Sequence, residues 1–186
     1  MSPSVEKVTA EALVRRLDLV PHPEGGFYRE TYRSAAEIPA DALTYGSGAA
    51  GSGGQGFPGP RVQGTAIYYL LTPDTFSEMH RLRADEVWHH YLGDAVEQLQ
   101  LDPATGAGRW VVYGKDLAAG QVPQGLAPRS VWQGARLVAD GEHGFALLGC
   151  TMAPGFDFAD YEAGRRHDLA TAFPRWKEPI GALTRS

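Results

Sequence analysis

The sequence predicts a mainly β protein, folded as an antiparallel sandwich or a closed barrel, with a short helix near each end. Two observations predict this class. Of the 186 residues, 23 are Gly and 13 are Pro. Their combined share of the sequence is well above the roughly 12% expected from average usage. Short runs of β-favouring residues alternate with turn signals about every 8–12 residues, which is typical of strands that pair through hairpins.

The elements follow from local patterns. Apolar side chains recur at helical spacing within residues 9–19, where Thr9 is suited to cap the N-terminus and Pro21 lies beyond the end. Residues 27–33, FYRETYR, alternate aromatic and charged side chains and predict the first strand. A last short helix is expected over 167–173, before Pro174. The other strands are expected over 65–71, 76–82, 86–92, 95–101, 109–113, 125–128, 131–139 and 145–152.

The length predicts one domain. A chain of 186 residues is below the size at which one hydrophobic core stops growing, so we expect a single domain over 1–186 with its core over 10–175. The stretch 46–60, GSGAAGSGGQGFPGP, holds seven glycines and no charged side chain. We interpret it as a flexible loop, because the preceding segment contains too little structure for a core of its own.

Charge and targeting signals exclude several classes of partner. Seventeen basic and 22 acidic residues give a net charge of -5 and no basic run, so we expect no nucleic-acid partner. The single Cys150 lies in an apolar run and predicts an inert buried thiol in a reducing compartment. No signal peptide and no run of 18 apolar residues is present. These features predict a cytoplasmic protein without a membrane partner.

The residues richest in chemistry lie between 77 and 94. If 86–92 is a strand, Glu86, Trp88 and His90 share one face. His80 lies on the preceding strand, so it can face Glu86 across a hairpin. In a barrel, apolar walls would raise the pKa of the carboxyl and suit it to proton transfer. The alternative is that these side chains are ordinary core residues and a satisfied buried pair.

A second, weaker cluster follows a proline turn. In residues 128–133, PRSVWQ, Trp132 and Gln133 begin a predicted strand. Gln133 would offer an amide to a polar ligand, or it would be an exposed strand residue. His22, between two prolines, is expected in a solvated loop, as are His143 and His167. The block 154–160 is expected to close one end of the barrel or to form an interface.

These motifs resemble a known superfamily. The spacing of His80, Glu86 and Gly93 is similar to the first signature of the cupins, and residues 128–133 lie where the second signature belongs. Over roughly residues 10–175 the chain resembles the small single-domain cupins classed as a domain of unknown function. Five blocks in the same order carry this resemblance, namely 24–31, 65–71, 79–82, 85–89 and 149–160.

The resemblance implies a double-stranded β-helix, or jelly-roll barrel, with a small-molecule ligand at its mouth and subunits that pair as homodimers. Metal-dependent cupins have further histidines where this chain has Leu82 and Gln133, and Ser130 replaces a glycine of the second signature. A catalytic transition metal usually needs at least three protein ligands. We therefore expect no metal and no other cofactor, unless His90 converges on His80 to complete a ligand set.

Metal-free cupins suggest the chemistry. By resemblance to the barrel of deoxysugar-nucleotide epimerases, His80 would abstract a proton and Glu86 would orient it or act as its partner. Arg29 and Arg33 would point away from Tyr28 and Glu30 in a regular strand, which leaves no evident diphosphate site. The same resemblance would assign a carbohydrate-like ligand to Tyr28, Glu30, Trp88, His90, Trp132 and Gln133.

Three functions remain after these arguments. The first is a metal-independent cupin that binds a small polar molecule. The second is an epimerase or isomerase that uses His80 and Glu86 as acid and base. The third, a metal-dependent dioxygenase or decarboxylase, is disfavoured by Leu82 and Gln133.

Overall fold

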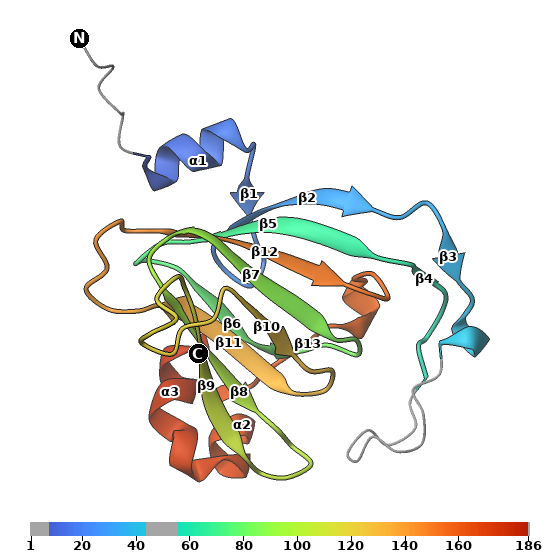
Figure 1. Ribbon diagram of the computed structural model, residues 1–186. Coiled ribbons are helices and arrows are strands. Elements are labelled where there is room, and N and C mark those ends of the chain that lie inside the picture. The colour runs from blue at the N-terminus through green and yellow to red at the C-terminus, as the bar shows by residue number, and fades with distance from the viewer. Residues whose placement is uncertain (1–7, 44–55, 186) are drawn as a thin grey trace.

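The computed structural model describes residues 8–43 and 56–185, and it confirms a mainly β fold built from two facing sheets (Figure 1). Most of the predicted loop 46–60 lies outside these residues. The first sheet contains, in spatial order, β1 (Val20–Pro21), β2 (Phe27–Arg33), β5 (Thr65–Leu71), β12 (Ala146–Met152), β7 (Glu86–Gly93) and β10 (Gln124–Ala127). The second contains β13 (Glu162–Ala163), β6 (Phe76–Arg81), β11 (Trp132–Leu137), β8 (Val96–Leu101) and β9 (Gly108–Tyr113).

The order of the strands is that of a jelly roll. Strands β5, β6, β7 and β8 alternate between the two sheets, and β12 returns to lie between β5 and β7. Neighbouring strands within each sheet are antiparallel. This confirms the architecture that the resemblance implied. A separate two-stranded ribbon is formed by β3 (Glu37–Ile38) and β4 (Arg61–Val62).

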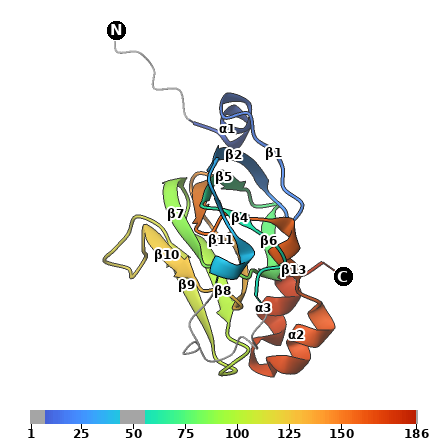
Figure 2. The same ribbon diagram turned by 90° about the vertical axis from the view of Figure 1, so that its right-hand side faces the viewer.

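The helices cover the outer faces of the barrel, as Figure 2 shows for the C-terminal pair. The first helix, α1 (Ala10–Arg16), has Thr9 as its N-cap and packs Leu13 near Leu70 of β5. Helices α2 (Arg166–Ala172) and α3 (Lys177–Ala182) cover the second sheet. Short 3-10 turns complete the chain at η1 (Ala40–Ala42), η2 (Phe158–Asp160) and η3 (Pro174–Trp176).

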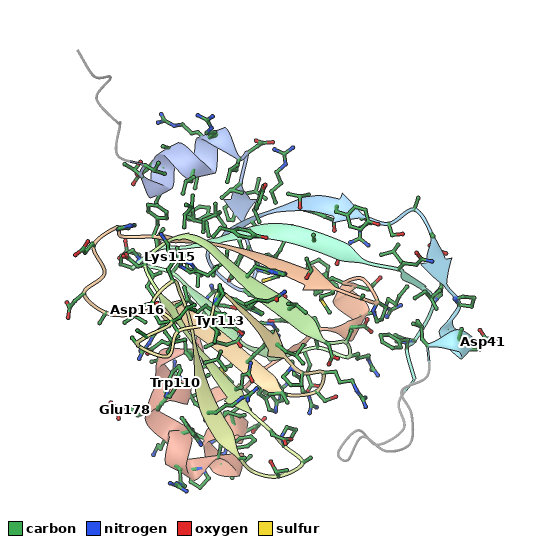
Figure 3. The ribbon with its side chains drawn as sticks, in the orientation of Figure 1. Asp41, Trp110, Tyr113, Lys115, Asp116 and Glu178 are labelled. Carbon is green, nitrogen blue, oxygen red and sulfur yellow. The ribbon has the colours of Figure 1, made fainter. Side chains whose placement is uncertain are left out.

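Most predicted elements are confirmed to within two residues, but α3 was not predicted. Its sequence, KEPIGA, contains Pro179 and Gly181, both poor residues for a helix interior. Tertiary packing stabilises it instead, since Ile180 and Leu183 are fully buried against the second sheet. Trp110 of β9 lies toward these helices (Figure 3), with its ring 6.4 Å from that of Trp176.

Because these helices cover its outer face, the central strands β8 and β11 of the second sheet are buried on both sides over most of their length. Along β8, Leu99 and Leu101 pack against the helices, whereas Gln98 and Gln100 point to the barrel interior. Cys150 of β12 is buried in the interior cluster, as predicted. Among the described residues, no helix has the length and apolar character needed to cross a membrane.

Candidate functional site

A cavity of about 360 Å³ lies inside the barrel. Its walls come from β2, β5, β7 and β12 of the first sheet, from β6 of the second, and from the segments 22–24 and 156–158. This volume is near the lower end for small-molecule sites. The ionisable side chains on its walls, apart from tyrosine and cysteine, are His22, Glu24, Glu30, Arg33, His80, Glu86 and Asp157.

His80 is held in one tautomer. Its Nδ1 lies 2.7 Å from the carbonyl oxygen of Glu78, which can only accept, so Nδ1 carries the proton and Nε2 is the basic nitrogen. The imidazole stacks on Tyr161, with ring centroids 5.4 Å apart. Burial lowers the pKa of His80, and Glu86 partly offsets this effect. The ring is therefore neutral at pH 7, with a free base on the cavity wall.

Glu86 is fixed by two donors. Trp88 Nε1 donates to Glu86 Oε2 at 2.9 Å, and Gln133 Nε2 donates to the same oxygen at 2.8 Å. Burial, together with Glu24, raises the pKa of Glu86 above its ordinary value, and His80 and these two hydrogen bonds oppose that rise. Charge-assisted hydrogen bonds of this kind favour the carboxylate form. The structure thus brings the predicted pair His80 and Glu86 to one cavity.

Glu24 is a buried acid that the sequence did not single out. Its Oε2 lies 3.4 Å from His80 Nδ1 and 4.0 Å from His22 Nδ1. Burial and the nearby Glu78 raise its pKa to about 8, so it is protonated at neutral pH. Its neighbour His22 was expected in a solvated loop, but it lines the cavity, and burial lowers its pKa to about 4.

Aromatic rings form much of the remaining wall. Tyr69 packs edge-on against Trp88, with centroids 5.8 Å apart, and its hydroxyl donates to the Gly25 carbonyl at 2.8 Å. Tyr28 packs edge-on against His22 at 4.5 Å. Phe156 and Phe158, which belong to the block that was expected to close the barrel, also line the cavity. Aromatic walls with polar groups at fixed positions are typical of small-molecule sites.

A β-bulge brings Arg33 to the cavity. Glu30 pairs with Ile67 but Tyr32 pairs with Ala66, so Thr31 is an extra residue in β2. The extra residue shifts the alternation, and Arg33 lies on the same side as Glu30. Arg33 donates to both Glu30 oxygens, at 3.0 and 2.7 Å. The expectation that Arg33 points away was wrong, because the strand is not regular.

Two predicted ligand residues do not line the cavity. His90 shares the inward face with Glu86 and Trp88, but it lies about 7 Å further along the strand than Trp88. There its Nε2 lies 2.9 Å from the Asp94 carbonyl. Trp132 lies on the outer face of β11, in the cluster under the C-terminal helices. Trp132 and Gln133 alternate, so only one of them can face inward, and that residue is Gln133.

The remaining predicted residues lie at the cavity. Tyr28, Glu30 and Trp88 line it, and Gln133 reaches it through its hydrogen bond to Glu86.

Comparison with known proteins identifies the family. A family model described as the cupin superfamily, DUF985, matches residues 11–164. The chain belongs to this cupin family. The uncharacterized protein YML079W of Saccharomyces cerevisiae is 31% identical over 153 residues, which cover 81% of this cupin and 73% of the yeast protein.

Two solved structures share the fold of this cupin over nearly its whole length. A hypothetical protein from Leishmania major has a TM-score of 0.81 and 31% identity, covering 96% of this chain and 100% of that chain. Protein SO0799 from Shewanella oneidensis has a TM-score of 0.77 and 32% identity, covering 96% and 98%.

The donor set of this cupin does not fit a resident transition metal. Leu82 lines the cavity where metal-dependent cupins are expected to have a histidine. Gln133 donates to Glu86 and accepts from Gln98, so its amide has no free oxygen directed at the cavity. His90 is bound to Asp94 instead of converging on His80. Within 8–43 and 56–185, no three His, Cys, Asp or Glu side chains form a group able to hold a metal ion.

Proposed function

We propose that this cupin binds a small, uncharged, hydroxyl-bearing molecule, such as a carbohydrate, in the barrel cavity, and that it needs no resident metal ion to do so. The observation that carries the proposal is the fixed tautomer of His80. Because Nδ1 donates to Glu78, Nε2 offers a lone pair to a ligand hydroxyl or to an acidic C–H.

The charges on the wall support an uncharged ligand. Glu30, Glu86 and Asp157 contribute carboxyl groups, and Glu24 adds a protonated one. The one cationic side chain among the described lining residues is Arg33, which is paired with Glu30 at 2.7 Å. A phosphate or carboxylate ligand would meet this excess of negative charge without a free cation to compensate it.

The aromatic wall supports a compact ring. Trp88 and Tyr69 present ring surfaces beside the carboxyl groups, and buried polar groups at fixed positions give a ligand its orientation. Glu24, as a protonated acid, can donate a hydrogen bond, whereas Glu86 and His80 can accept. A sugar hydroxyl both donates and accepts, so it can satisfy these groups together.

A second candidate, an isomerase or epimerase, is favoured by the same three residues. A neutral imidazole beside a protonated carboxyl and the carboxyl group of Glu86 provides a base and an acid in one cavity. His80 Nε2 would remove a proton from the carbon next to a carbonyl, and Glu24 would donate a proton to the developing oxyanion. His80 would then return a proton, exchanged with solvent, to the carbon, while the enol hydroxyl returned its proton to Glu24 and the carbonyl reformed.

One experiment tests both candidates. A panel of aldoses, ketoses and their 6-phosphates is incubated with the protein in D₂O, and ¹H NMR reports binding by saturation transfer and exchange by loss of the α-proton signal. We expect neutral sugars to bind better than the phosphates. Catalysis predicts α-proton exchange that His80→Ala slows by about 10²–10⁴-fold. Binding without exchange supports the binding protein.

The matched control is His90→Gln, a buried histidine on β7 outside the cavity. It should leave binding and exchange unchanged, whereas Glu86→Gln should weaken both. The proposal is contradicted if no neutral sugar binds, or if the phosphates bind more tightly than the neutral sugars. Equal effects of His80→Ala and His90→Gln would also contradict it.

A further inference from the structure

A chain of three buried glutamines joins the cavity carboxylate to an exposed guanidinium. Gln133 Nε2 donates to Glu86 Oε2 at 2.8 Å, and Gln98 Nε2 donates to Gln133 Oε1 at 2.9 Å. Gln100 Nε2 donates to Gln98 Oε1 at 2.7 Å. Arg109 then donates twice to Gln100 Oε1, at 3.0 and 2.8 Å. The chain crosses three neighbouring strands, β11, β8 and β9.

The guanidinium of Arg109 determines the orientation of each amide group in the chain. Arginine has donors only, so the oxygen of Gln100 must face Arg109. The nitrogen of Gln100 then faces Gln98, and the same reasoning sets Gln98 and Gln133. All three amide dipoles therefore point their positive ends toward Glu86. Aligned hydrogen bonds polarise one another and act most strongly away from water.

The three amides are buried, so the network is stable only if each amide has hydrogen-bond partners. Gln98, Gln100 and Gln133 are 0%, 3% and 2% exposed, and each buried amide without a partner would cost about 1–3 kcal/mol. Tyr113 of β9, which is labelled in Figure 3, donates to Gln98 Oε1 at 3.0 Å. Gln100 also donates to the Leu126 carbonyl at 2.9 Å. The network is thus closely tied to the surrounding strands.

We propose that Arg109 is a positioning residue that acts through Gln100, Gln98 and Gln133 to hold Glu86 as an oriented anion in the cavity. The role rests on the proposed function only in taking Glu86 as a ligand-facing group. This role was not recognisable in the sequence, because Gln98 and Gln100 alternate with Leu99 and Leu101 as they would on an ordinary exposed strand face.

Other groups around Glu86 bear on its charge. Burial raises its pKa, and His80, Trp88 and Gln133 lower it. Five ionisable side chains interact with Glu86. They are His80 on β6, Glu24 in the segment before β2, Cys150 on β12, Tyr69 on β5 and Tyr113 on β9. Of these groups, His80 lowers the pKa of Glu86 and Glu24 raises it. Two hydrogen bonds favour the carboxylate directly, one from Trp88 and one from Gln133, which is the end of the glutamine chain.

Arg109 is suited to substitution. Its side chain is at the surface, where it borders a second hollow of about 220 Å³ together with Gln100, Asp102 and Pro128. Replacing it therefore removes the cationic end of the chain without leaving a cavity in the core. Arg136 is the matched control, since it is a partly exposed arginine of the same sheet that pairs with Glu97 at 2.6 Å instead of with the glutamines.

The test is a ¹³C NMR titration of the glutamate side-chain carboxyl groups, with the Glu86 signal assigned by its loss in Glu86→Gln. We expect Arg109→Gln to raise the titration midpoint of Glu86 by about one pH unit. Arg109→Lys should restore at least half of that shift, and Arg136→Gln should cause none. No sugar is present, so the result is independent of whether the cavity binds one.

A double-mutant cycle separates an effect through the chain from a direct field effect. Gln98→Met interrupts the chain, so adding Arg109→Gln to it should move the Glu86 midpoint no further. The proposal is overturned if Arg109→Gln leaves the midpoint unchanged, if Arg136→Gln shifts it equally, or if the shift persists in the Gln98→Met background. Should Gln98→Met not fold, the arginine series alone decides.

Discussion

Glu24 and His80 form a buried acid–imidazole pair, with Oε2 of the carboxyl 3.4 Å from Nδ1 of the ring and side-chain exposures of 9% and 3%. Both groups are uncharged at neutral pH, because burial raises the pKa of Glu24 to about 8 and lowers that of His80. A neutral pair avoids the cost of burying an ion pair. It also gives the cavity a proton donor and a proton acceptor at the same pH.

The ionisation of Glu24 should destabilise the folded protein between pH 6.5 and 8. The ordinary pKa of glutamate is 4.5, so over this range the unfolded chain has lost the Glu24 proton while the folded protein keeps it. Rising pH therefore favours unfolding, by about 2 kcal/mol over the 1.5 pH units. The lowered pKa values of His22, about 4, and of His80 have the opposite sign around and below pH 6.5, so the Glu24 contribution is isolated by comparison with a Glu24 variant.

Urea unfolding at pH 6.5 and 8 measures this effect. Glu24→Gln, which mimics the protonated acid, should remove about 2 kcal/mol of the difference between the two pH values, whereas the exposed Glu142→Gln should keep it. A pH dependence that is the same in Glu24→Gln and in the unaltered protein would contradict the assignment of a neutral, buried Glu24.

The stability of the protein should depend on the ion pair between Arg61 and Asp160. Arg61 Nε and Nη2 each donate to Asp160 at 2.7 Å, and the side chains are only 5% and 2% exposed. Asp160→Asn leaves the buried guanidinium uncompensated, so it should cost about 3–5 kcal/mol in urea unfolding. Asp157→Asn keeps the hydrogen-bonding oxygen for Ala159 N–H and should cost under about 1 kcal/mol. Equal losses of unfolding free energy in Asp160→Asn and Asp157→Asn would contradict this prediction.

The fold was largely predictable because its signals are local. The β5 segment, TAIYYLL, and the Thr9 cap were recognisable within a few residues, and the structure has both. Two-residue strands such as β1 have no periodicity to detect. Helix α3 forms through burial of Ile180 rather than through helix propensity, so its own sequence did not reveal it.

Residues of the site could be predicted only where they lie on the same strand. Glu86 and Trp88 lie two residues apart on β7, so strand alternation placed them together. His22 and Glu24 reach the cavity from a turn, whose path no pattern in the chain specifies. The bulge at Thr31 changes which side Arg33 occupies, and such an inserted residue becomes evident only from the pairing with β5.

The purified protein should contain less than stoichiometric Fe, Mn, Ni and Zn. Leu82 has no donor atom, and the amide of Gln133 is already engaged by Glu86 and Gln98, so His80 and Glu86 do not reach the three ligands that such metals need. Elemental analysis of protein prepared without a His tag checks this. Stoichiometric metal that disappears in His80→Ala would show that the cavity holds an ion.

Trp88 should report ligand binding and Trp132 should not. Trp88 lines the cavity and donates to Glu86, whereas Trp132 lies on the outer face of β11 with Arg81 4.6 Å from its ring. Trp88→Phe should therefore abolish most of the fluorescence change on adding a sugar that binds in the NMR panel, and weaken binding by about 5–10-fold through loss of the Nε1 hydrogen bond.

Trp132→Phe should keep both the fluorescence change and the affinity, while losing about 1–3 kcal/mol of stability from the cluster that contains Leu99 and Phe173. The two substitutions are chemically identical, so the contrast depends only on which side of its sheet each indole occupies. A fluorescence response that depends on Trp132 instead would mean that the ligand binds between the second sheet and the C-terminal helices, and not in the barrel.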